Sequence, residues 1–593
     1  MAVSPKGLSI QSLYRDYRDG TLVINRQYQR KLVWTLKEKQ KLIESILLNY
    51  PLPLILLAEK PADDDGSKPT TEVIDGMQRL NAIFSFIEHR FTVEDSCFDL
   101  NEFARARQAK DEELFEEFDQ DVKRLSPEKC SDFLDYQLAV TSFSGEDSTR
   151  ITDIFGRINS GGKQLSDQDR RQAGVLTNFA ELVRELSAEL RGDVSRKRLA
   201  LYDMPQISIE TQQSPQGYEL KADEIFWCKQ GILRTGDLRD GDDEEMLIDI
   251  CASILHGTPV AGTRAYRDSL YNQEDTNAEK IGSLLQEYGP DKIIEEVKLV
   301  FSTFKNVIEE NSNAQNNFRT VVYPSPTSNA QKSPFFAVFM AFFDLIIKET
   351  MAPANSAEIM KCLENLTERI SVGQKQVNSE DRINNINLVK GLIRDHFNKE
   401  DLPALKHGAG VILDFENAIS RSKTETSRYE FKQGFLRLDD TRGIDSNILD
   451  TILETICGIA NAGPDADGYV YIGIADSNKD ADRISKLDKM TPIALNHVSV
   501  VGIEREAALL KKSVDEYVRL LTDHVKNSEL TDPLKTMMAT SIDSITYKKL
   551  EIIRVRVPAQ KQISFVGGDA FMRVGSSTER ASGPEIAAIT AKF

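Results

Sequence analysis

Three acidic side chains and a lysine near the end of the chain have the types and spacing of a site that handles phosphate. Glu425, Glu430 and Lys432 lie in the segment ETSRYEFK, and Asp476 ends the segment GYVYIGIAD. Carboxylate oxygens are the ligands that hard cations such as Mg²⁺ or Mn²⁺ prefer. A cation held by three carboxylates, with a lysine nearby, can activate water and stabilise charge on a phosphate. The pattern therefore indicates metal-dependent phosphodiester hydrolysis.

Two strands and one helix must position these residues. The residue pattern predicts strands over 429–435 and 469–475, and an apolar stripe predicts a helix over 447–461. If the two strands are neighbours, Asp476 lies at the end of the sheet beside Glu430. We therefore expect an α/β arrangement here.

The spacing of the acidic residues sets a condition on the backbone. Glu430 and Lys432 are two apart and share one face of a strand, whereas Glu425 and Glu430 lie on opposite faces of an extended segment. A bend or bulge near Ser427 is needed if both glutamates are to reach one ion. The alternative is that Glu430 and Lys432 form the solvated face of an amphipathic strand, and the spacing leaves both interpretations open.

Length and composition indicate a folded protein of several domains. The chain has 593 residues, too many for one core, and its 40% hydrophobic and 28% charged residues are ordinary for globular proteins. The net charge of −19 argues against coating of nucleic acid by bulk attraction. Any basic groove must therefore be confined to a small surface.

Cysteine usage and hydropathy favour a cytoplasmic protein without a membrane segment. The six cysteines form no CxxC pair, so we expect reduced core residues and no zinc site. The longest apolar run, residues 335–343, is too short to cross a bilayer and predicts a buried helix.

The pattern of elements predicts a multidomain α+β chain of three regions. Residues 1–173 mix helices and strands, residues 174–405 are mostly helical, and residues 406–593 are α/β. The expected elements of the first two regions are strands over 53–58 and 72–74 and helices over 78–87, 179–190, 293–307 and 383–397.

A second candidate site lies in the first region, in the segment EVIDGMQRL. A strand that turns at Asp75 and Gly76 into a helix presents backbone N–H groups and Arg79 at a helix N-terminus, where anions bind. Asp75 and Gln78 could position water or a metal ion beside a bound phosphate. The alternative is an Asp-Gly turn followed by solvated side chains.

The C-terminal region, roughly residues 410–593, resembles the Schlafen-type AlbA-like domain. The shared patterns are E-x4-E-F-K, an apolar helix that runs into I-A-N-A-G, GYVYIGIAD, and R-x-G-S-S-T-x-x-A near the end. The resemblance implies a metal-dependent RNA-cleaving site built from Glu425, Glu430 and Asp476, with Lys432 as a phosphate contact. Relatives that lack the first glutamate are described as regulators or DNA binders, and its presence here favours catalysis.

Two details of this resemblance concern the ends of the strands. The turn AGPDADG replaces the family's compact N-x-x-G-G and lengthens the path to Asp476. Hydroxyl and guanidinium donors could line a nucleic-acid path; they are Arg573, Ser576, Ser577 and Thr578. The alternative for these residues is a strand with an ordinary Gly-Ser-Ser turn.

The first region, about residues 8–175, resembles the N-terminal domain of GmrSD-type modification-dependent restriction proteins, in a ParB-like superfamily with an α/β fold. The family patterns are Y-Q-R-x-x-x-W, D-G-Q-Q-R and F-x-R-x-N-x-x-G-x-x-L. The resemblance implies binding of a nucleoside triphosphate (GTP, ATP or CTP), with or without hydrolysis. The nucleotide-binding residues it implies are Tyr28, Gln29, Arg30, Asp75, Gly76, Gln78, Arg79, Arg157 and Asn159. Met77 replaces the first glutamine, which makes binding better supported than hydrolysis.

Together these features predict an anti-phage defence effector. The first region would sense a nucleotide or foreign DNA, the helical region would relay the signal, and the last region would cleave RNA such as tRNA, or phage DNA. We expect a gated homo-oligomer without membrane contact. One alternative is a non-catalytic, NTP-gated DNA-binding regulator. Another places all of the chemistry, as an NTPase or nuclease, in the first region.

Overall fold

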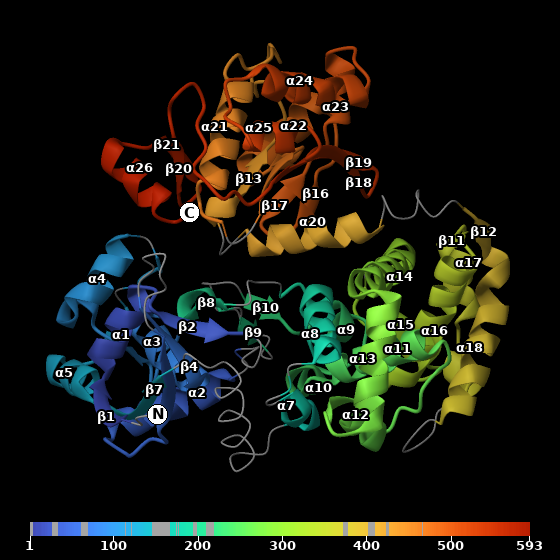
Figure 1. The fold of residues 1–593 in the computed structure, drawn as a ribbon, viewed down its shortest axis with the longest axis horizontal. Coiled ribbons are helices and arrows are strands. Elements are labelled where there is room, and N and C mark those ends of the chain that lie inside the picture. The colour runs from blue at the N-terminus through green and yellow to red at the C-terminus, as the bar shows by residue number, and fades with distance from the viewer. Residues whose placement is uncertain are drawn as a thin grey trace. The chain divides into compact units, whose positions relative to one another are not determined.

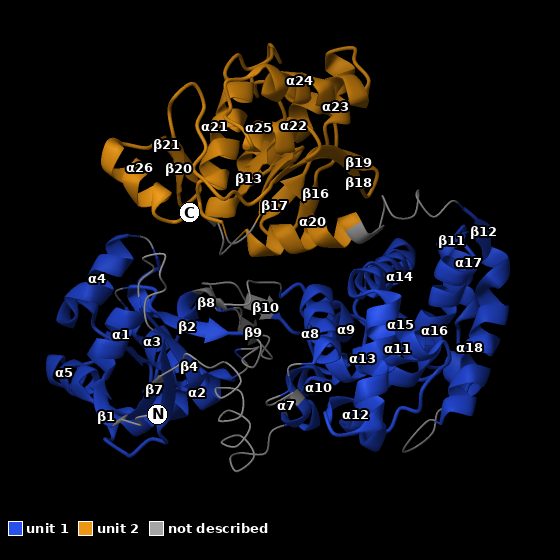
Figure 2. Ribbon diagram, viewed as in Figure 1, with its two compact units in different colours: residues 1–64, 68–402 blue, residues 65–67, 403–593 orange. Residues whose placement is uncertain are grey.

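A computed structural model gives the fold as two compact units, residues 1–64 with 68–402 and residues 65–67 with 403–593 (Figure 1 and Figure 2). The structure describes residues 4–26, 32, 34–60, 69–112, 114–119, 121–144, 166–172, 175, 177–193, 198–204, 206–208, 219–312, 314–371, 378–400, 409–422, 426–464 and 467–593. Each unit has its own hydrophobic core.

A mixed six-stranded sheet opens the first unit. In spatial order its strands are β1 (Ser4–Ser9), β7 (Gln137–Ser144), β3 (Ile55–Lys60), β4 (Thr70–Asp75), β2 (Leu22–Asn25) and β8 (Arg198–Ala200). The pairs β3–β7 and β2–β4 are parallel, and the other pairs are antiparallel. The sheet takes β8 from beyond residue 173. The strands expected over 53–58 and 72–74 are confirmed as β3 and β4.

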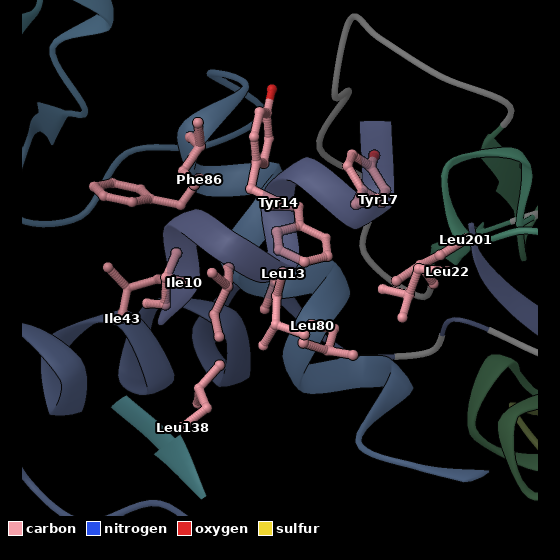
Figure 3. Packing of buried hydrophobic residues seen from close by; sticks show 14 of the residues in the cluster. Ile10, Leu13, Tyr14, Tyr17, Leu22, Ile43, Leu80, Phe86, Leu138 and Leu201 are labelled. Carbon is pink, nitrogen blue, oxygen red and sulfur yellow. The ribbon is translucent and has the colours of Figure 1, made fainter. Parts of the chain in front are cut away.

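Helices bury their apolar faces in one core with residues of this sheet. They are α1 (Ile10–Arg18), α2 (Leu36–Leu47), α3 (Met77–Ile87), α4 (Ala104–Asp111) and α5 (Pro127–Asp135). Figure 3 shows Leu13 of α1, Leu80 of α3 and Leu138 of β7 within one core, where each is at most 1% exposed. The expected helix over 78–87 is confirmed as α3. Its packing in this core also fixes the Asp75–Gly76 turn that precedes it.

The middle of the chain is a helical body. Its helices are α7 (Asp167–Gln172), α8 (Asn178–Arg191), α9 (Phe226–Lys229), α10 (Thr235–Asp240), α11 (Asp242–His256), α12 (Arg264–Tyr271), α13 (Thr276–Tyr288), α14 (Pro290–Asn311), α15 (Asn317–Val322), α16 (Lys332–Phe343), α17 (Ser356–Cys362) and α18 (Ser379–Ile393). The apolar run is buried in α16, as expected. Among the described residues, no helix is long and apolar enough to cross a membrane.

One expected helix ends early. Spacing predicts a helix over 383–397, but α18 ends at Ile393, and Phe397 begins β12 (Phe397–Lys399), which pairs with β11 (Met351–Pro353). The Phe397 ring packs edge-on against Phe342 at 5.2 Å between centroids. This tertiary contact explains why the helical spacing does not continue into helix.

The second unit is built on a four-stranded sheet in the order β13 (Tyr429–Lys432), β14 (Gly468–Ile472), β19 (Leu550–Val557) and β18 (Ile542–Tyr547). Strands β13 and β14 are parallel neighbours, as expected, and α21 (Ile448–Ala460) connects them. Helix α20 (Ala409–Arg421) packs on one face, and α21, α24 (Val514–Asn527) and α25 (Leu534–Met538) pack on the other.

Smaller elements complete this unit. They are β15 (Ile474–Ala475), α22 (Asn478–Asp488), β16 (Ile493–Leu495), β17 (Val498–Val500), α23 (Glu504–Leu509), the hairpin of β20 (Phe571–Val574) and β21 (Ser577–Arg580), and α26 (Gly583–Thr590).

All six cysteines of the chain are unpaired, and five of them are buried.

Two strand predictions in this unit need correction. The strand expected over 469–475 is broken at Gly473, whose φ of +105° favours glycine, and β15 belongs to a separate sheet with β17 and β16. The strand expected over 429–435 ends at Lys432, because the backbone N–H of Phe435 donates to the Glu506 carboxylate at 2.6 Å instead of to the sheet.

Asn461, at the end of α21, holds two distant segments together. Its side-chain N–H groups donate to the carbonyls of Ser564 (3.0 Å) and Phe571 (2.8 Å), and its oxygen accepts from the Ser564 N–H at 2.8 Å. The residue is 1% exposed. The I-A-N-A-G pattern therefore has a structural role, which is to attach the start of β20 to α21.

We expect Asn461→Ala to destabilise the second unit by about 1–3 kcal/mol, because it leaves buried backbone groups without partners. Urea unfolding followed by circular dichroism, with hydrogen exchange to assign the transition, measures the loss. Asn527→Ala, at the exposed end of α24, is the matched control and should be near neutral. Equal stability of the two variants would contradict this role for Asn461.

Candidate functional site

Glu430 and Lys432 lie on the edge strand β13, on the face toward α21. Tyr429 and Phe431 alternate with them and pack into the core beneath α20. The Glu430 side chain is 13% exposed and that of Lys432 is 25% exposed. Neither is the freely solvated side chain of an amphipathic strand.

Both carboxylate oxygens of Glu430 are engaged by cations. Lys432 Nζ lies 2.6 Å from Oε1, and Arg573 Nη2 lies 2.9 Å from Oε2. The Arg573 side chain is 1% exposed and also donates to the Tyr429 carbonyl (3.1 Å) and to Thr578 Oγ1 (2.8 Å). We call Glu430, Lys432, Arg573 and Thr578 the Glu430 cluster. The structure thus joins two predicted groups of site residues that are far apart in the sequence.

Helix α21 and the β20–β21 hairpin hold the Glu430 cluster in place. Thr578 Oγ1 lies 3.1 Å from Thr455 Oγ1 of α21, which itself donates to the Thr451 carbonyl at 2.8 Å. A Cβ at Gly458 of α21 would lie 3.4 Å from the Thr578 methyl group and 3.4 Å from the Met572 backbone. A small residue at this position therefore allows the hairpin to approach the helix closely.

Gly575 and Ser576 of the R-x-G-S-S-T segment form the hairpin turn, and Ser577 begins β21. Ser576 and Ser577 are exposed, and Gly575 adopts φ +58° between the two strands. Their hydroxyl groups are open to solvent, whereas Arg573 is turned inward to Glu430. A role of Ser576 and Ser577 in binding nucleic acid stays a prediction.

Asp476 comes just after β15, the short strand that belongs to the three-stranded sheet, and it is exposed. The backbone N–H of Gly473 donates to the Lys432 carbonyl at 2.8 Å, and β15 lies beside β13. Asp476 therefore follows a segment next to the end of β13, and its meeting with Glu430 at one ion stays a prediction.

Glu425 lies outside the described residues. A short 3₁₀ helix at Thr426–Arg428 lies where the sequence analysis placed a bend near Ser427. Among the residues that the structure describes, no three His, Cys, Asp or Glu side chains form a group that could hold a metal ion. The metal set of Glu425, Glu430 and Asp476 therefore stays a prediction.

The second candidate site lies where β4 turns into α3. Gly76 adopts φ +106°, and a Cβ there would lie 3.0 Å from the Ile55 side chain, so the turn requires glycine. Arg79 Nη2 pairs with Asp75 Oδ2 at 2.7 Å, and Nη1 donates to the carbonyls of Pro53 and Leu54. Asp75 is 38% exposed, and Arg79 is 11% exposed.

Two neighbours of this turn explain further details of the segment. Gln78 Oε1 accepts a hydrogen bond from the Trp34 backbone N–H at 3.3 Å. Met77 is 7% exposed and packs into the core, so the departure from the D-G-Q-Q-R pattern falls on a packing position. The other predicted nucleotide-binding residues lie outside the described residues; they are Tyr28, Gln29, Arg30, Arg157 and Asn159.

The residues that flank these undescribed segments are tied to the helical body, which the sequence analysis did not anticipate. Arg26 donates to the Asp193 carbonyl (2.7 Å) and pairs with its carboxylate (3.0 Å). Glu38 pairs with Arg239 of α10 at 3.0 Å. The T-x-x-E capping-box pattern at Thr35 marks the start of α2, but it does not indicate that Glu38 contacts Arg239.

A third contact comes from α7, which follows the F-x-R-x-N segment. Gln168 donates to Glu244 at 3.3 Å, and Arg171 pairs with Glu245 at 2.5 Å and with Asp268 at 2.5 Å. Glu244 and Glu245 belong to the run DDEE at the start of α11. That run is the sequence signal that could have located this contact.

We expect the Glu38–Arg239 contact to depend on pH. Partial burial raises the pKa of Glu38, but hydrogen bonds from Thr35 and Arg239 outweigh it and lower the pKa from 4.5 to about 2. Its contribution to stability is therefore complete above pH 4.5 and is lost as pH falls toward 2. Urea midpoints of wild type and Glu38→Gln should converge over that interval, and a constant difference would contradict the assignment.

Two family models match the chain. Residues 10–176 match the model described as GmrSD restriction endonuclease, N-terminal domain, and residues 425–582 match the model described as Schlafen, AlbA_2. Comparisons with curated proteins and with solved structures gave no match. The first match spans the Asp75–Arg79 turn and α7, and the second spans the whole Glu430 cluster. One chain therefore joins a region similar to the N-terminal domain of GmrSD restriction endonucleases to a region similar to the Schlafen AlbA_2 domain.

Proposed function

We propose that the second unit cleaves nucleic acid and that the first unit controls this cleavage, as an anti-phage defence effector. The observation that carries the proposal is the Glu430 cluster: a carboxylate at the edge of a sheet, held between a buried arginine and a partly exposed lysine. Cationic donors fixed beside a carboxylate are suited to bind a phosphodiester and stabilise the charge that develops on it.

The proposed chemistry is metal-dependent hydrolysis. The carboxylate oxygens of Glu430 are donors of the kind that Mg²⁺ or Mn²⁺ takes, and Glu425 and Asp476 would complete the set. A bound ion would supply an activated water and positive charge at the phosphate. In the described structure Lys432 Nζ lies 2.6 Å from Oε1 of Glu430 and Arg573 Nη2 lies 2.9 Å from Oε2, so a bound ion would have to share this carboxylate with both cations.

The proposed substrate is RNA such as tRNA, which the similarity to Schlafen proteins favours. Phage DNA is the other candidate, because the N-terminal match is to restriction endonucleases. The net charge of −19 means that the substrate must be held by local contacts. The exposed hydroxyl groups of Ser576 and Ser577 are candidates for such contacts.

The proposed control begins with a nucleoside triphosphate bound near the Asp75–Arg79 turn. Arg26 and Glu38, which flank the Y-Q-R segment, are bonded to Asp193 and Arg239 of the helical body. A ligand that changes the backbone between Arg26 and Glu38 would change these contacts. The same ion pairs therefore give the helical body a physical route to relay occupancy of the site.

The regulator hypothesis remains the second candidate. The observation that favours it is that both oxygens of Glu430 are already paired, as in a purely structural ion pair. A regulator would bind nucleic acid without any requirement for a divalent ion. Dependence on metal therefore separates the two candidates.

We expect the purified protein, given Mn²⁺, to cleave total tRNA or phage DNA, and EDTA to stop the reaction. Glu430→Ala should lower the rate at least about 100-fold, because it removes the carboxylate that organises the charges of the site. The matched control is Glu579→Ala on the neighbouring hairpin, which removes an exposed acid and should leave the rate unchanged.

Other outcomes of that experiment have definite meanings. No cleavage with any nucleotide present would favour the regulator. Cleavage that survives Glu430→Ala but is lost in Asp75→Ala would place the chemistry in the first unit. Strong constitutive cleavage by a monomer would contradict gating and the expected homo-oligomer.

We expect Asp75→Asn to weaken nucleotide binding about tenfold, because loss of the carboxylate charge frees Arg79 from its orientation. Calorimetric titration with GTP, ATP and CTP in the presence of Mg²⁺ measures this directly. Asp111→Asn, at the exposed end of α4, is the matched control. Equal affinity of wild type and Asp75→Asn would remove Asp75 from the proposed site.

A further inference from the structure

Residues 48–54, which connect α2 to β3, form an exposed apolar loop in the first unit. Leu48 is 61% exposed, Tyr50 is 57% exposed and Leu54 is 49% exposed, and the two prolines of the loop are exposed beside them. The other large hydrophobic side chains that the structure describes as exposed are scattered singly along the chain. Single exposed apolar residues are ordinary, whereas several together mark an interaction site.

Hydrogen bonds to its carbonyl groups hold this loop in one shape. The Tyr136 hydroxyl donates to the Tyr50 carbonyl at 2.6 Å, and Arg79 donates to the carbonyls of Pro53 and Leu54. The proline rings also fix φ at two positions of the loop. The apolar side chains are therefore presented by an ordered backbone, which reduces the entropy that is lost on binding.

The loop lies in an uncharged stretch of an acidic chain. Residues 48–58 contain no charged side chain, although the chain as a whole carries a net charge of −19. The loop thus offers no cation to the phosphates of a nucleic acid. Two copies of this chain repel each other over most of their surfaces, and an uncharged loop is a place where they can meet without bringing like charges together.

The two helices that flank the loop carry opposite charge on their exposed faces. Helix α2 runs into the loop and exposes Lys37, Lys41 and Glu44, so it is basic on balance. Helix α5 runs into Tyr136, which is bonded to the loop. The exposed charges of α5 make it acidic on balance; they are Glu128, Lys129, Asp132 and Asp135. A basic and an acidic face on either side of an apolar loop form a self-complementary surface.

We propose that residues 48–54 are the surface through which two copies of this chain pair about a two-fold axis. The apolar loops face each other, and α2 of each copy faces α5 of the other, because a two-fold interface presents the same patch twice. One loop and two helix faces make a small interface, so we expect a dissociation constant on the order of 10 µM. This inference goes beyond the proposed function and does not rest on it, since the pairing needs neither nucleotide nor nucleic acid.

Sedimentation of the full chain over a range of concentrations, without nucleotide, measures the pairing. We expect Leu48→Ser to weaken it about tenfold, because the variant removes apolar surface that the partner copy would cover. Leu509→Ser is the matched control, because Leu509 is exposed to a similar extent (52%) in the second unit. The control should pair as wild type does.

Charge reversal tests the two-fold arrangement. Lys37→Glu/Lys41→Glu and Asp132→Lys/Asp135→Lys should each pair at least about tenfold more weakly than wild type, since like charges then face one another. An equimolar mixture of these two variants should recover the affinity of wild type. In the mixed pair each interface again joins an acidic face to a basic face, and no contact within a single chain produces that recovery.

Four results would overturn the proposal: a wild type that stays monomeric, equal pairing of wild type and Leu48→Ser, an equal loss in Leu509→Ser, and a mixture that pairs no better than its components. Binding of single-stranded RNA or of anionic lipid vesicles that is lost in Leu48→Ser, by a chain that stays monomeric, would assign the loop to another partner and also overturn it. Cleavage and nucleotide binding play no part in these measurements, so failure of the proposed function leaves the result on pairing unchanged.

Discussion

The ion pair between Arg573 and Glu430 is the contact on which the second unit depends. It joins β13 to the β20–β21 hairpin, and Thr578 extends it to Thr455 of α21. A guanidinium group that is 1% exposed cannot be left without a carboxylate, because removing one partner of a buried pair costs about 3–5 kcal/mol. The hairpin, the helix and the edge strand therefore keep one arrangement, and this arrangement fixes the orientation of Glu430.

Buried ion pairs also fix the arrangement of elements in the first unit. Arg191 of α8 is 1% exposed and pairs with Asp193 and with Asp243, and Asp193 in turn binds Arg26. Buried pairs of this kind add little net stability but disfavour every arrangement that separates them. They consequently hold Arg26, which precedes the Y-Q-R segment, against the end of α8.

Local pattern was sufficient to predict most elements but not the site. The apolar stripe predicted α21, and the Asp-Gly step predicted the turn into α3, because neighbouring residues decide both. The break of the second strand at Gly473 was missed, since a φ of +105° there depends on packing against Gly502 and Ile503. The pairing of Arg573 with Glu430 was missed as well, because nothing in either segment indicates a partner so distant along the chain.

The charge of the whole chain limits how nucleic acid could reach the Glu430 cluster. At a net charge of −19 the protein repels nucleic acid at long range, so binding would depend on specific local contacts. Arg573 is 1% exposed and is held by Glu430, the Tyr429 carbonyl and Thr578, whereas the Lys432 side chain is 25% exposed. Under the proposed function a phosphate would therefore meet Lys432 before Arg573, and local docking rather than bulk attraction would decide which nucleic acid is bound.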